Sequence, residues 1–247
     1  VVSALRDYLS NVFTDRAHDI DLSFYATKDD SVRLHHEQHI MDADRKSYTL
    51  HIPRQNDMHT AVANLEGNGA VSLEGGDYCH STRLWPLRSD TVPSHKTGLF
   101  TARQQMVMKE GVPQTFKVKL YMANCAVALI IDPRENSYRR IKVVGTGFAS
   151  GFNLADSAYR HVVNPPIVLA DKVEIPETNQ LCYCTVNFPS KEPTDTRRVI
   201  ETEEPFISKD AGKALWQLRA YVTMANGKTT ETVLGINHPL RAGQLKM

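Results

Sequence analysis

The sequence predicts an all-β protein made of two tandem β-sandwich domains, with a short helix at the N-terminus. Short runs in which apolar and polar residues alternate recur along most of the chain, as is typical of strands with one buried face. Most of the 12 prolines stand between these runs and mark turns. A length of 247 residues fits two sandwiches of ordinary size.

The composition excludes several functional classes. The chain has 29 Lys and Arg residues against 28 Asp and Glu residues, and a net charge of +1 leaves no basic footprint for nucleic acid or an acidic membrane surface. No run approaches the roughly 20 apolar residues of a membrane span. We therefore expect a globular protein with no nucleic-acid partner.

The first element is a helix over residues 1–13. Apolar side chains recur there at spacings of three and four, as on one face of an amphipathic helix. They are Val2, Leu5, Leu9, Val12 and Phe13.

Strands are predicted from residue 21 onward. Residues 21–39 alternate on both sides of a polar turn at 28–31, which is a hairpin signal. Residues 59–69 form a short apolar run that ends in turn residues. Residues 47–53 predict a strand with three apolar side chains on one side, Tyr48, Leu50 and Ile52.

One long strand is predicted over residues 116–133. This run alternates at first, then becomes continuously apolar, and stops at Asp132-Pro133. The polar stretch "KEGVPQT" at 109–115 comes directly before it and contains both Gly and Pro. We therefore place the domain boundary there, with an N-terminal sandwich at 1–115 and a C-terminal sandwich at 116–247.

Four further runs predict strands in the second half, at 139–150, 166–175, 181–189 and 215–224. A three-residue turn at 225–227, with Gly in the left-handed position, leads into another strand at 228–235. The alternating face of residues 216–224 is predicted to form core, through Trp216, Leu218, Ala220, Val222 and Met224.

The chain has four cysteines, Cys79, Cys125, Cys182 and Cys184. A Cys-x-Cys pair lacks the spacing of a zinc knuckle. On a strand, Cys182 and Cys184 would share one face and Tyr183 would point to the other. We read all four as small buried hydrophobic residues, and the sequence leaves open whether any of them form a disulfide.

The stretch "HHEQH" at residues 35–39 is the strongest metal-like pattern. HExxH chemistry requires a helix, on which histidines four apart lie on one face. This stretch lies on the return arm of the predicted hairpin, so His35, Glu37 and His39 share a strand face instead. We interpret it as a solvated strand face and not as a catalytic metal site.

Other catalytic patterns are weak. The glycines of "GTGFASG" at 145–151 have neither the spacing nor the βαβ context of a phosphate loop, and a strand end with bulges explains them better. Glu201, Glu203 and Glu204 read as a solvated loop before a proline. The sequence therefore predicts no catalytic, cofactor-binding or metal-binding residue, and no enzyme.

Several stretches resemble the FimB-like fimbrial anchor and accessory proteins of Bacteroidales-type fimbriae. They are "YTLHIPRQNDMHTAVANLEGN", "LFTARQQMVMKEG", "VKLYMANCAVALIID", "GTGFASGFNLADSAY" and "ETVLGINHPLRAGQLKM". The resemblance runs from about residue 19 to the C-terminus and rests on structural, not catalytic, motifs.

This resemblance implies two tandem transthyretin-like sandwiches in a fimbrium-associated protein. It also implies export as a lipoprotein, with a lipidated N-terminal cysteine upstream of the helix, and attachment to the outer membrane at the cell surface. The expected partners are fimbrial stalk or accessory subunits, bound by strand pairing, and the segment at 231–247 is the first candidate for the contact. The other reading of that segment is simply the final strand of the second domain.

A carbohydrate-binding sandwich that contacts host or bacterial glycans is the alternative function. Sugar platforms need exposed aromatic side chains, and the aromatic residues at alternating spacing also fit a core role. The candidates for such a platform are Tyr78, Trp85, Phe152, Tyr159 and Tyr183.

Overall fold

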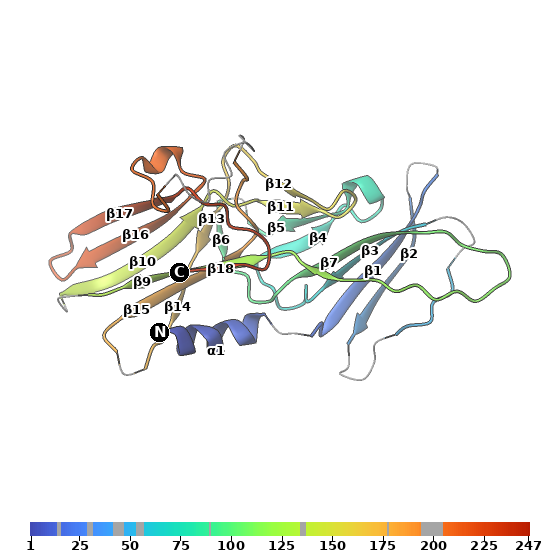
Figure 1. Ribbon diagram of the computed structural model, residues 1–247, viewed down its shortest axis with the longest axis horizontal. Coiled ribbons are helices and arrows are strands. Elements are labelled where there is room, and N and C mark those ends of the chain that lie inside the picture. The colour runs from blue at the N-terminus through green and yellow to red at the C-terminus, as the bar shows by residue number, and fades with distance from the viewer. Residues whose placement is uncertain are drawn as a thin grey trace.

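The computed structural model describes residues 1–13, 16–28, 32–41, 47–52, 57–88, 90–133, 137–176, 178–193 and 205–247. The described chain contains one α-helix, α1 (Val2–Val12), two short 3-10 turns, η2 (Cys79–Ser81) and η3 (Ala211–Lys213), and strands in four sheets. The molecule is elongated, with α1, β9, β10 and β14 to β17 at one end and β1 to β3 at the other (Figure 1). Among the described helices, none is long and apolar enough to cross a membrane.

Two sheets lie at the end that contains β1. Sheet 1 has the order β2-β1-β3-β7-β8 and consists of β2 (Arg33–Ile40), β1 (Asp19–Ala26), β3 (Asp57–Ala63), β7 (Phe100–Met106) and β8 (Tyr121–Met122). Sheet 2 has the order β12-β11-β5-β4 and consists of β12 (Ala158–Arg160), β11 (Gly151–Asn153), β5 (Arg83–Pro86) and β4 (Val71–Glu74).

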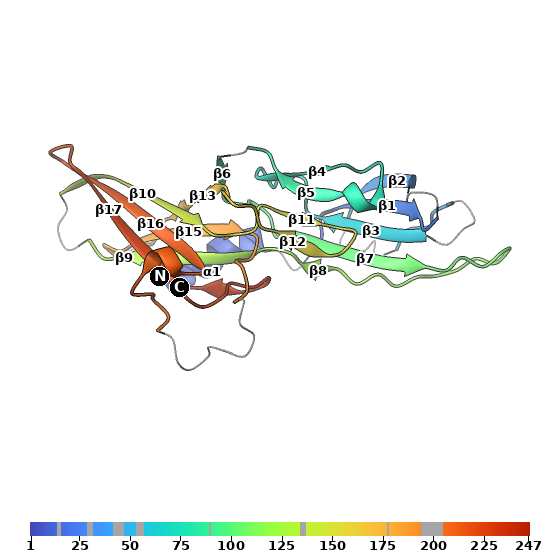
Figure 2. The same cartoon turned by 90° about the horizontal axis from the view of Figure 1, so that it is seen from above.

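The other two sheets lie at the end that contains α1. Sheet 3 has the order β17-β16-β10-β13-β6 and consists of β17 (Thr229–Ile236), β16 (Trp216–Met224), β10 (Tyr138–Thr146), β13 (Ile167–Leu169) and β6 (Thr91–Pro93). Sheet 4 has the order β14-β15-β9-β18 and consists of β14 (Asp171–Val173), β15 (Leu181–Asn187), β9 (Cys125–Ile131) and β18 (Leu245–Lys246). The four sheets are consistent with two sandwiches, so the mostly-β prediction is confirmed, and Figure 2 shows the same arrangement from above.

The first sandwich buries side chains between sheets 1 and 2. Val62 of β3, Leu84 of β5 and Phe152 of β11 belong to one buried cluster, because alternate residues of each strand point inward. The predicted hairpin is confirmed, since β1 and β2 pair antiparallel along their length. The predicted turn at 28–31 lies outside the described residues apart from Lys28.

The outer face of sheet 1 is also covered. Tyr48, Leu50 and Ile52 pack on the cluster that contains Phe24 and Ala61. Their predicted orientation is therefore confirmed, but the predicted strand is wrong, because residues 47–52 form no strand ladder. Side-chain packing fixes this segment without backbone pairing.

The long strand predicted at 116–133 is also wrong. Residues 116–120 lie without a ladder against the outer face of sheet 1, and the chain then passes through the two-residue strand β8. Only Cys125–Ile131 forms a long strand, β9, and it belongs to sheet 4. Residues 116–120 and Cys125–Ile131 are both rich in apolar side chains because each of the two segments packs on a different core.

The second sandwich buries the predicted face of β16. Trp216 is 1% exposed and Leu218 is 5% exposed, and both contact the cluster that includes Val127 of β9. Their predicted core role is confirmed, and Ala220 is buried as well. Val222 and Met224, nearer the hairpin tip, are only half-buried.

Helix α1 covers the outer face of sheet 4 (Figure 1). Leu5, Leu9 and Val12 are buried against small side chains that leave room for the helix, among them Ala126, Ala128, Cys182 and Cys184. The predicted helix is thus confirmed. All four cysteines are free and buried, and Tyr183 lies in a different cluster from its two Cys neighbours, as the strand prediction required.

Several segments lie with strands from the other half of the chain. Strand β6 pairs in parallel with β13 of sheet 3, and β11 pairs with β5 of sheet 2. Residues 166–175, predicted as one strand, instead form β13 and β14 in two different sheets, with the switch at Ala170. The sheets therefore interlock across residue 115, and the boundary predicted there stays a prediction.

Candidate functional site

The "HHEQH" stretch lies on β2, the last strand of sheet 1 in the described structure. His35 and His39 both contact the Glu37 carboxylate, His39 through its Nε2 at 2.6 Å from Oε2. The hydrogen bond with His35 is the main reason that the pKa of Glu37 is held below its usual range. Within the described ranges, no group of three or more His, Cys, Asp or Glu side chains is arranged to hold a metal ion.

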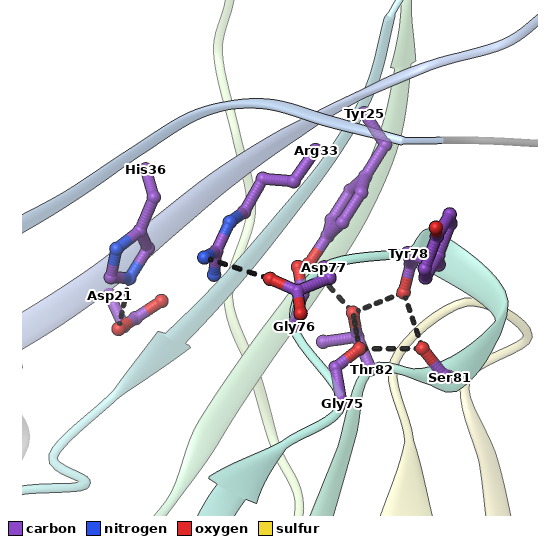
Figure 3. Close-up of polar contacts among 10 residues, drawn as sticks. All are labelled: Asp21, Tyr25, Arg33, His36, Gly75, Gly76, Asp77, Tyr78, Ser81 and Thr82. Carbon is purple, nitrogen blue, oxygen red and sulfur yellow. Dashed lines mark hydrogen bonds and ion pairs between the residues drawn. The ribbon is translucent and has the colours of Figure 1, made fainter.

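His36 points to the opposite face of the strand. Its Nε2 lies 2.8 Å from Oδ2 of Asp21 on β1 (Figure 3). Gln38 donates a hydrogen bond to the same oxygen at 3.0 Å. Because Asp21 is buried, these two contacts satisfy a carboxylate that would otherwise be costly. This polar set belongs to the packing of the hairpin.

A loop at residues 75–82 closes over the beginning of β2 (Figure 3). The backbone N–H of Arg33 donates to the carbonyl of Asp77 at 2.8 Å, and the guanidinium of Arg33 lies 3.4 Å from the Asp77 carboxylate. Inside the loop, the Tyr25 hydroxyl lies 2.6 Å from Oγ1 of Thr82. The loop thus occupies the outer edge of β2 at its first residue.

A second edge lies in sheet 4. Strand β9 pairs with β15 along all seven residues on one side. On the other side, β18 pairs only with Ala126 and Val127, so within the described chain the edge from Ala128 to Ile131 has no strand partner. The N–H of Ala126 points toward β18, because it donates to Gln244. By the alternation of a strand, the N–H groups of Ala128 and Ile130 point the same way.

Exposed apolar side chains lie around that edge. Ile130 is 38% exposed, Leu245 is 43% exposed and Met247 is 60% exposed. Phe206, Leu245 and Met247 line a shallow hollow with Gln244 and Lys246. An unpaired edge with apolar side chains beside it is the usual setting for strand addition.

The five aromatic residues proposed as a sugar platform separate into two groups. Phe152 and Tyr183 are buried, and Tyr159 packs between Phe152 and Phe188 while its hydroxyl donates to the carbonyl of Ala123 at 2.7 Å. Tyr78 is 43% exposed, and Trp85 lines a cleft of about 450 Å³ on the outer face of sheet 2. Only the last two are placed to meet a ligand.

The glycine-rich stretch, the glutamate cluster and the cysteines do not contribute to a site in the described structure. Gly147 in "GTGFASG" has a positive φ and packs its Cα side against the backbone of Trp216, as a turn between strands requires. Glu201, Glu203 and Glu204 lie outside the described residues. Burial raises the pKa of the Cys125 and Cys184 thiols, so neither has the thiolate character of a nucleophile.

No protein-family model matches the sequence, and no curated protein matches it at a significant level. Solved structures do match its fold. A proposed adhesin from Bacteroides ovatus is 9% identical, with a TM-score of 0.58 over 95% of this chain and 84% of that one. The chain has the fold of Bacteroides adhesin-like proteins.

Two other solved structures are similar. A proposed polysaccharide-binding protein from Bacteroides thetaiotaomicron is 11% identical, with a TM-score of 0.56 over 90% of this chain and 73% of that one. The fimbrial anchor protein Mfa2 from Porphyromonas gingivalis is 12% identical, with a TM-score of 0.49 over 87% of this chain and 73% of that one. The structural side of the resemblance read from the sequence is confirmed by the fold shared with the two Bacteroides structures, at TM-scores of 0.58 and 0.56.

Sequence reasoning missed both the free edge of β9 and the cleft beside Trp85. The edge depends on the register in which β18 lies along β9, beside Ala126 and Val127, which no local pattern encodes. The cleft is lined by residues from about 74 to 162, brought together by sheet pairing. Trp85 was among the candidates, but its neighbours could not be read from spacing.

Proposed function

We propose that this protein is a non-enzymatic cell-surface protein that serves as an anchor or accessory protein of a fimbria. We propose that it binds a fimbrial subunit by strand pairing. The resemblance read from the sequence and the shared fold with Bacteroides adhesin-like proteins support this proposal. We further propose that the sandwiches are transthyretin-like, and that the protein is held at the outer membrane by a lipid on a cysteine upstream of the helix.

The observation that carries the proposal is the incomplete cover of β9. Only two residue pairs join β18 to β9, and the edge beyond Val127 presents the outward N–H groups of Ala128 and Ile130. A strand from a partner can continue the sheet where β18 stops, with main-chain hydrogen bonds for affinity and Leu245 and Met247 as apolar contacts. The C-terminal segment expected to make the contact thus forms one side of the proposed surface.

The test uses a proline at the free edge. In Ile130→Pro the lost N–H is one that points away from β15, so the ladder inside the protein is kept while a donor to the partner is removed. Ile130→Ala is the matched control, because it trims the same exposed side chain and keeps the N–H. We expect the cognate stalk subunit to co-purify with the parent and with Ile130→Ala but not with Ile130→Pro.

A truncation tests the C-terminal contribution. Cutting after Gly235 would remove Ile236 and Leu240, which are 3% and 0% exposed, and would damage the core. Cutting after Arg241 removes β18 and keeps both residues. Recovery of the subunit by a folded truncation at the level of the parent would exclude the last six residues as a contact, and recovery by Ile130→Pro would refute strand addition at β9.

Glycan binding is the second candidate function, and one observation favours it. The cleft on sheet 2 combines the half-buried indole of Trp85 with polar side chains, and a relative with this fold is described as a polysaccharide-binding protein. Sugar sites combine an aromatic surface with a few placed polar groups. Retardation of the protein in a native gel that contains polysaccharide is the direct test.

A further inference from the structure

The cleft on the outer face of sheet 2 is built from two cross-strand rows. One row places Glu74 of β4 opposite Arg83 of β5, and Arg83 opposite Asn153 of β11. The neighbouring row contains Trp85 of β5 and Gly151 of β11. Gly151 in turn lies opposite Arg160 of β12. All of these except Gly151 line the cleft, and His80 and His161 line it as well.

Gly151 sets the position of the Trp85 ring. A β-carbon on Gly151 would lie 2.4 Å from Cε3 and 2.9 Å from Cζ3 of the indole, and 2.4 Å from the carbonyl oxygen of Leu84. The ring therefore rests on the bare backbone of β11, which only glycine allows. An indole supported on one side by a sheet presents its other side outward, as a stacking platform does.

Arg83 lies over the Trp85 ring. Its guanidinium carbon is 4.2 Å from the centroid of the Trp85 ring. Among the described residues, Arg83 forms one ion pair, with Glu74 at 3.4 Å, and both side chains are more than 40% exposed. Exposed pairs of this kind contribute little free energy, so Arg83 can leave the ring for a ligand carboxylate at small cost.

A second guanidinium flanks the platform. Arg160 lies opposite Gly151 and pairs with Asp156 at 2.5 Å, again with both partners largely exposed. The cleft lining carries two arginines against one carboxylate, Glu74. Burial and the nearby Lys191 lower the pKa of His161, so this lining histidine is held in its neutral form, and Lys191 adds to the positive field.

The wall opposite the platform is fixed. The side-chain amide of Asn153 donates to the carbonyl of His80 at 3.3 Å, and its oxygen accepts from the backbone N–H of Ala155 at 2.9 Å. The loop that carries His80 is the one held against β2 in Figure 3. Platform, cations and wall thus come from elements that hydrogen bonds tie together.

We propose that this cleft binds a polysaccharide that carries carboxylate groups, a uronic-acid polymer. One sugar ring stacks on the indole of Trp85, and the carboxylate of that sugar pairs with Arg160 and Arg83. To make this contact, Arg83 moves off the indole and replaces its ion pair with Glu74 by one with the sugar carboxylate. Arginine suits this role because its planar fork matches a carboxylate. This inference rests on the second candidate function, glycan binding, and is independent of strand pairing.

Affinity electrophoresis in native gels tests the proposal. The gels contain polygalacturonate, alginate or hyaluronate, and a fully methyl-esterified polygalacturonate serves as the matched polymer without charge. The variants are Trp85→Ala and Arg160→Gln, and Arg140→Gln, an exposed site on β10 of sheet 3, is the control for loss of one positive charge. Melting temperatures confirm that each variant is folded, and Arg160→Gln alters an exposed side chain, so the test survives if Trp85→Ala does not fold.

We expect at least one uronate polymer to retard the parent and Arg140→Gln. We expect at least about a tenfold loss of affinity in Arg160→Gln and Trp85→Ala, as for the loss of one strong charge pair. Equal retardation by the esterified polymer would overturn the inference about carboxylate while leaving glycan binding in place. No retardation by any of the four polymers would overturn the site itself, and neither result affects the test at Ile130.

Fluorescence gives an independent readout. The chain has two tryptophans, and Trp216 is 1% exposed, so acrylamide quenches mainly Trp85. A bound uronate polymer is expected to reduce that quenching. Binding seen in the gel with unchanged quenching would place the polymer elsewhere and overturn the assignment to this cleft.

Discussion

The side-chain oxygen of Asn124 accepts a hydrogen bond from the backbone N–H of Leu99 at 3.1 Å. The side-chain nitrogen donates to the carbonyl of Thr97 at 2.9 Å, and the residue is 0% exposed. Asn124 lies where the chain passes from β8 in sheet 1 to β9 in sheet 4. One buried amide thus secures the crossing between the two sandwiches.

Asn124→Ala is expected to lower the free energy of unfolding by about 1–3 kcal/mol, because it leaves the buried N–H of Leu99 without its acceptor and removes the shorter of two hydrogen bonds to the carbonyl of Thr97. Urea denaturation at neutral pH measures this change. Asn226→Ala, in the exposed turn between β16 and β17, is the control and should have a much smaller effect. Equal effects of the two substitutions would show that the crossing does not depend on Asn124.

His95 is expected to make the protein sensitive to acid. It is buried beside Phe188, and burial lowers its pKa to about 3 from the ordinary 6.5. Between these values the unfolded chain binds a proton that the native state excludes, so stability falls as the pH drops below 6.5. At pH 4.5 the loss amounts to about 2–3 kcal/mol from this group.

The check on His95 compares His95→Gln with the parent at pH 7.5 and pH 4.5. The difference in unfolding free energy, parent minus variant, should shrink by about 2–3 kcal/mol on acidification, because only the parent carries the protonation penalty. Asn226→Ala, which removes no titratable group from an exposed turn, should leave the difference constant. A constant difference for His95→Gln as well would rule out this histidine as an acid-sensitive group.

Asp57 should act in the opposite direction. It is 0% exposed, both carboxylate oxygens lack a hydrogen-bond partner among the described residues, and desolvation raises its pKa to about 6 from 3.8. The native state therefore holds its proton more tightly than the unfolded chain, and the resulting destabilisation is complete above pH 6 and fades toward pH 4.

Asp57→Asn is accordingly expected to stabilise the protein by about 1–3 kcal/mol at pH 7.5 and by little near pH 4. Denaturation curves at both pH values measure the gain. Asp132→Asn, at an exposed position, is the control. A loss of stability at pH 7.5 would mean that the carboxylate is needed in its charged form.

Helix α1 should contribute to the stability of the second sandwich. Leu5 is 1% exposed and packs on sheet 4, so Leu5→Ala is expected to lower the free energy of unfolding by about 2–5 kcal/mol. Val2→Ala removes a side chain that is 58% exposed on the same helix and should change it by less than about 0.5 kcal/mol. Similar values for both would indicate that the helix does not dock in solution.

The predicted boundary near residue 115 leads to an expectation for limited proteolysis. Val107 and Val112 are 58% and 61% exposed, and Lys109 between them is accessible to trypsin. A cut there should give two fragments on a denaturing gel that still elute together in native size-exclusion chromatography, since β6 and β11 each pair across the boundary. Separation of the fragments would mean that each half folds alone.

Local patterns identified the elements whose environment is the same along their whole length. The face of β16 and the helix at 2–12 each pack on one partner, so their periodicity was sufficient. The strand prediction for residues 116–133 was wrong because the run passes from one sheet to another at Asn124 without any change in apolar character. The run at 166–175 did the same at Ala170. A change of sheet is a tertiary event, and a sequence pattern records only that a side chain is buried.

The candidate sites were harder to predict for a related reason. Trp85 could be named as an exposed aromatic, but Gly151, which supports its ring, is 66 positions away in the sequence, and Arg160 lies farther still. The edge of β9 depends on where β18 lies along it, beside Ala126 and Val127. Neither feature has a spacing that could be recognised without the sheet order.

The docking of α1 has a mechanical consequence. Both described ends of the chain attach to sheet 4, the helix through its apolar face and β18 through its pairing with β9 (Figure 1). Tension applied between the two ends is therefore borne first by the second sandwich. Sheet 1 begins to carry load only after α1 has been peeled from sheet 4, so the first sandwich is shielded from a pull that the second one resists.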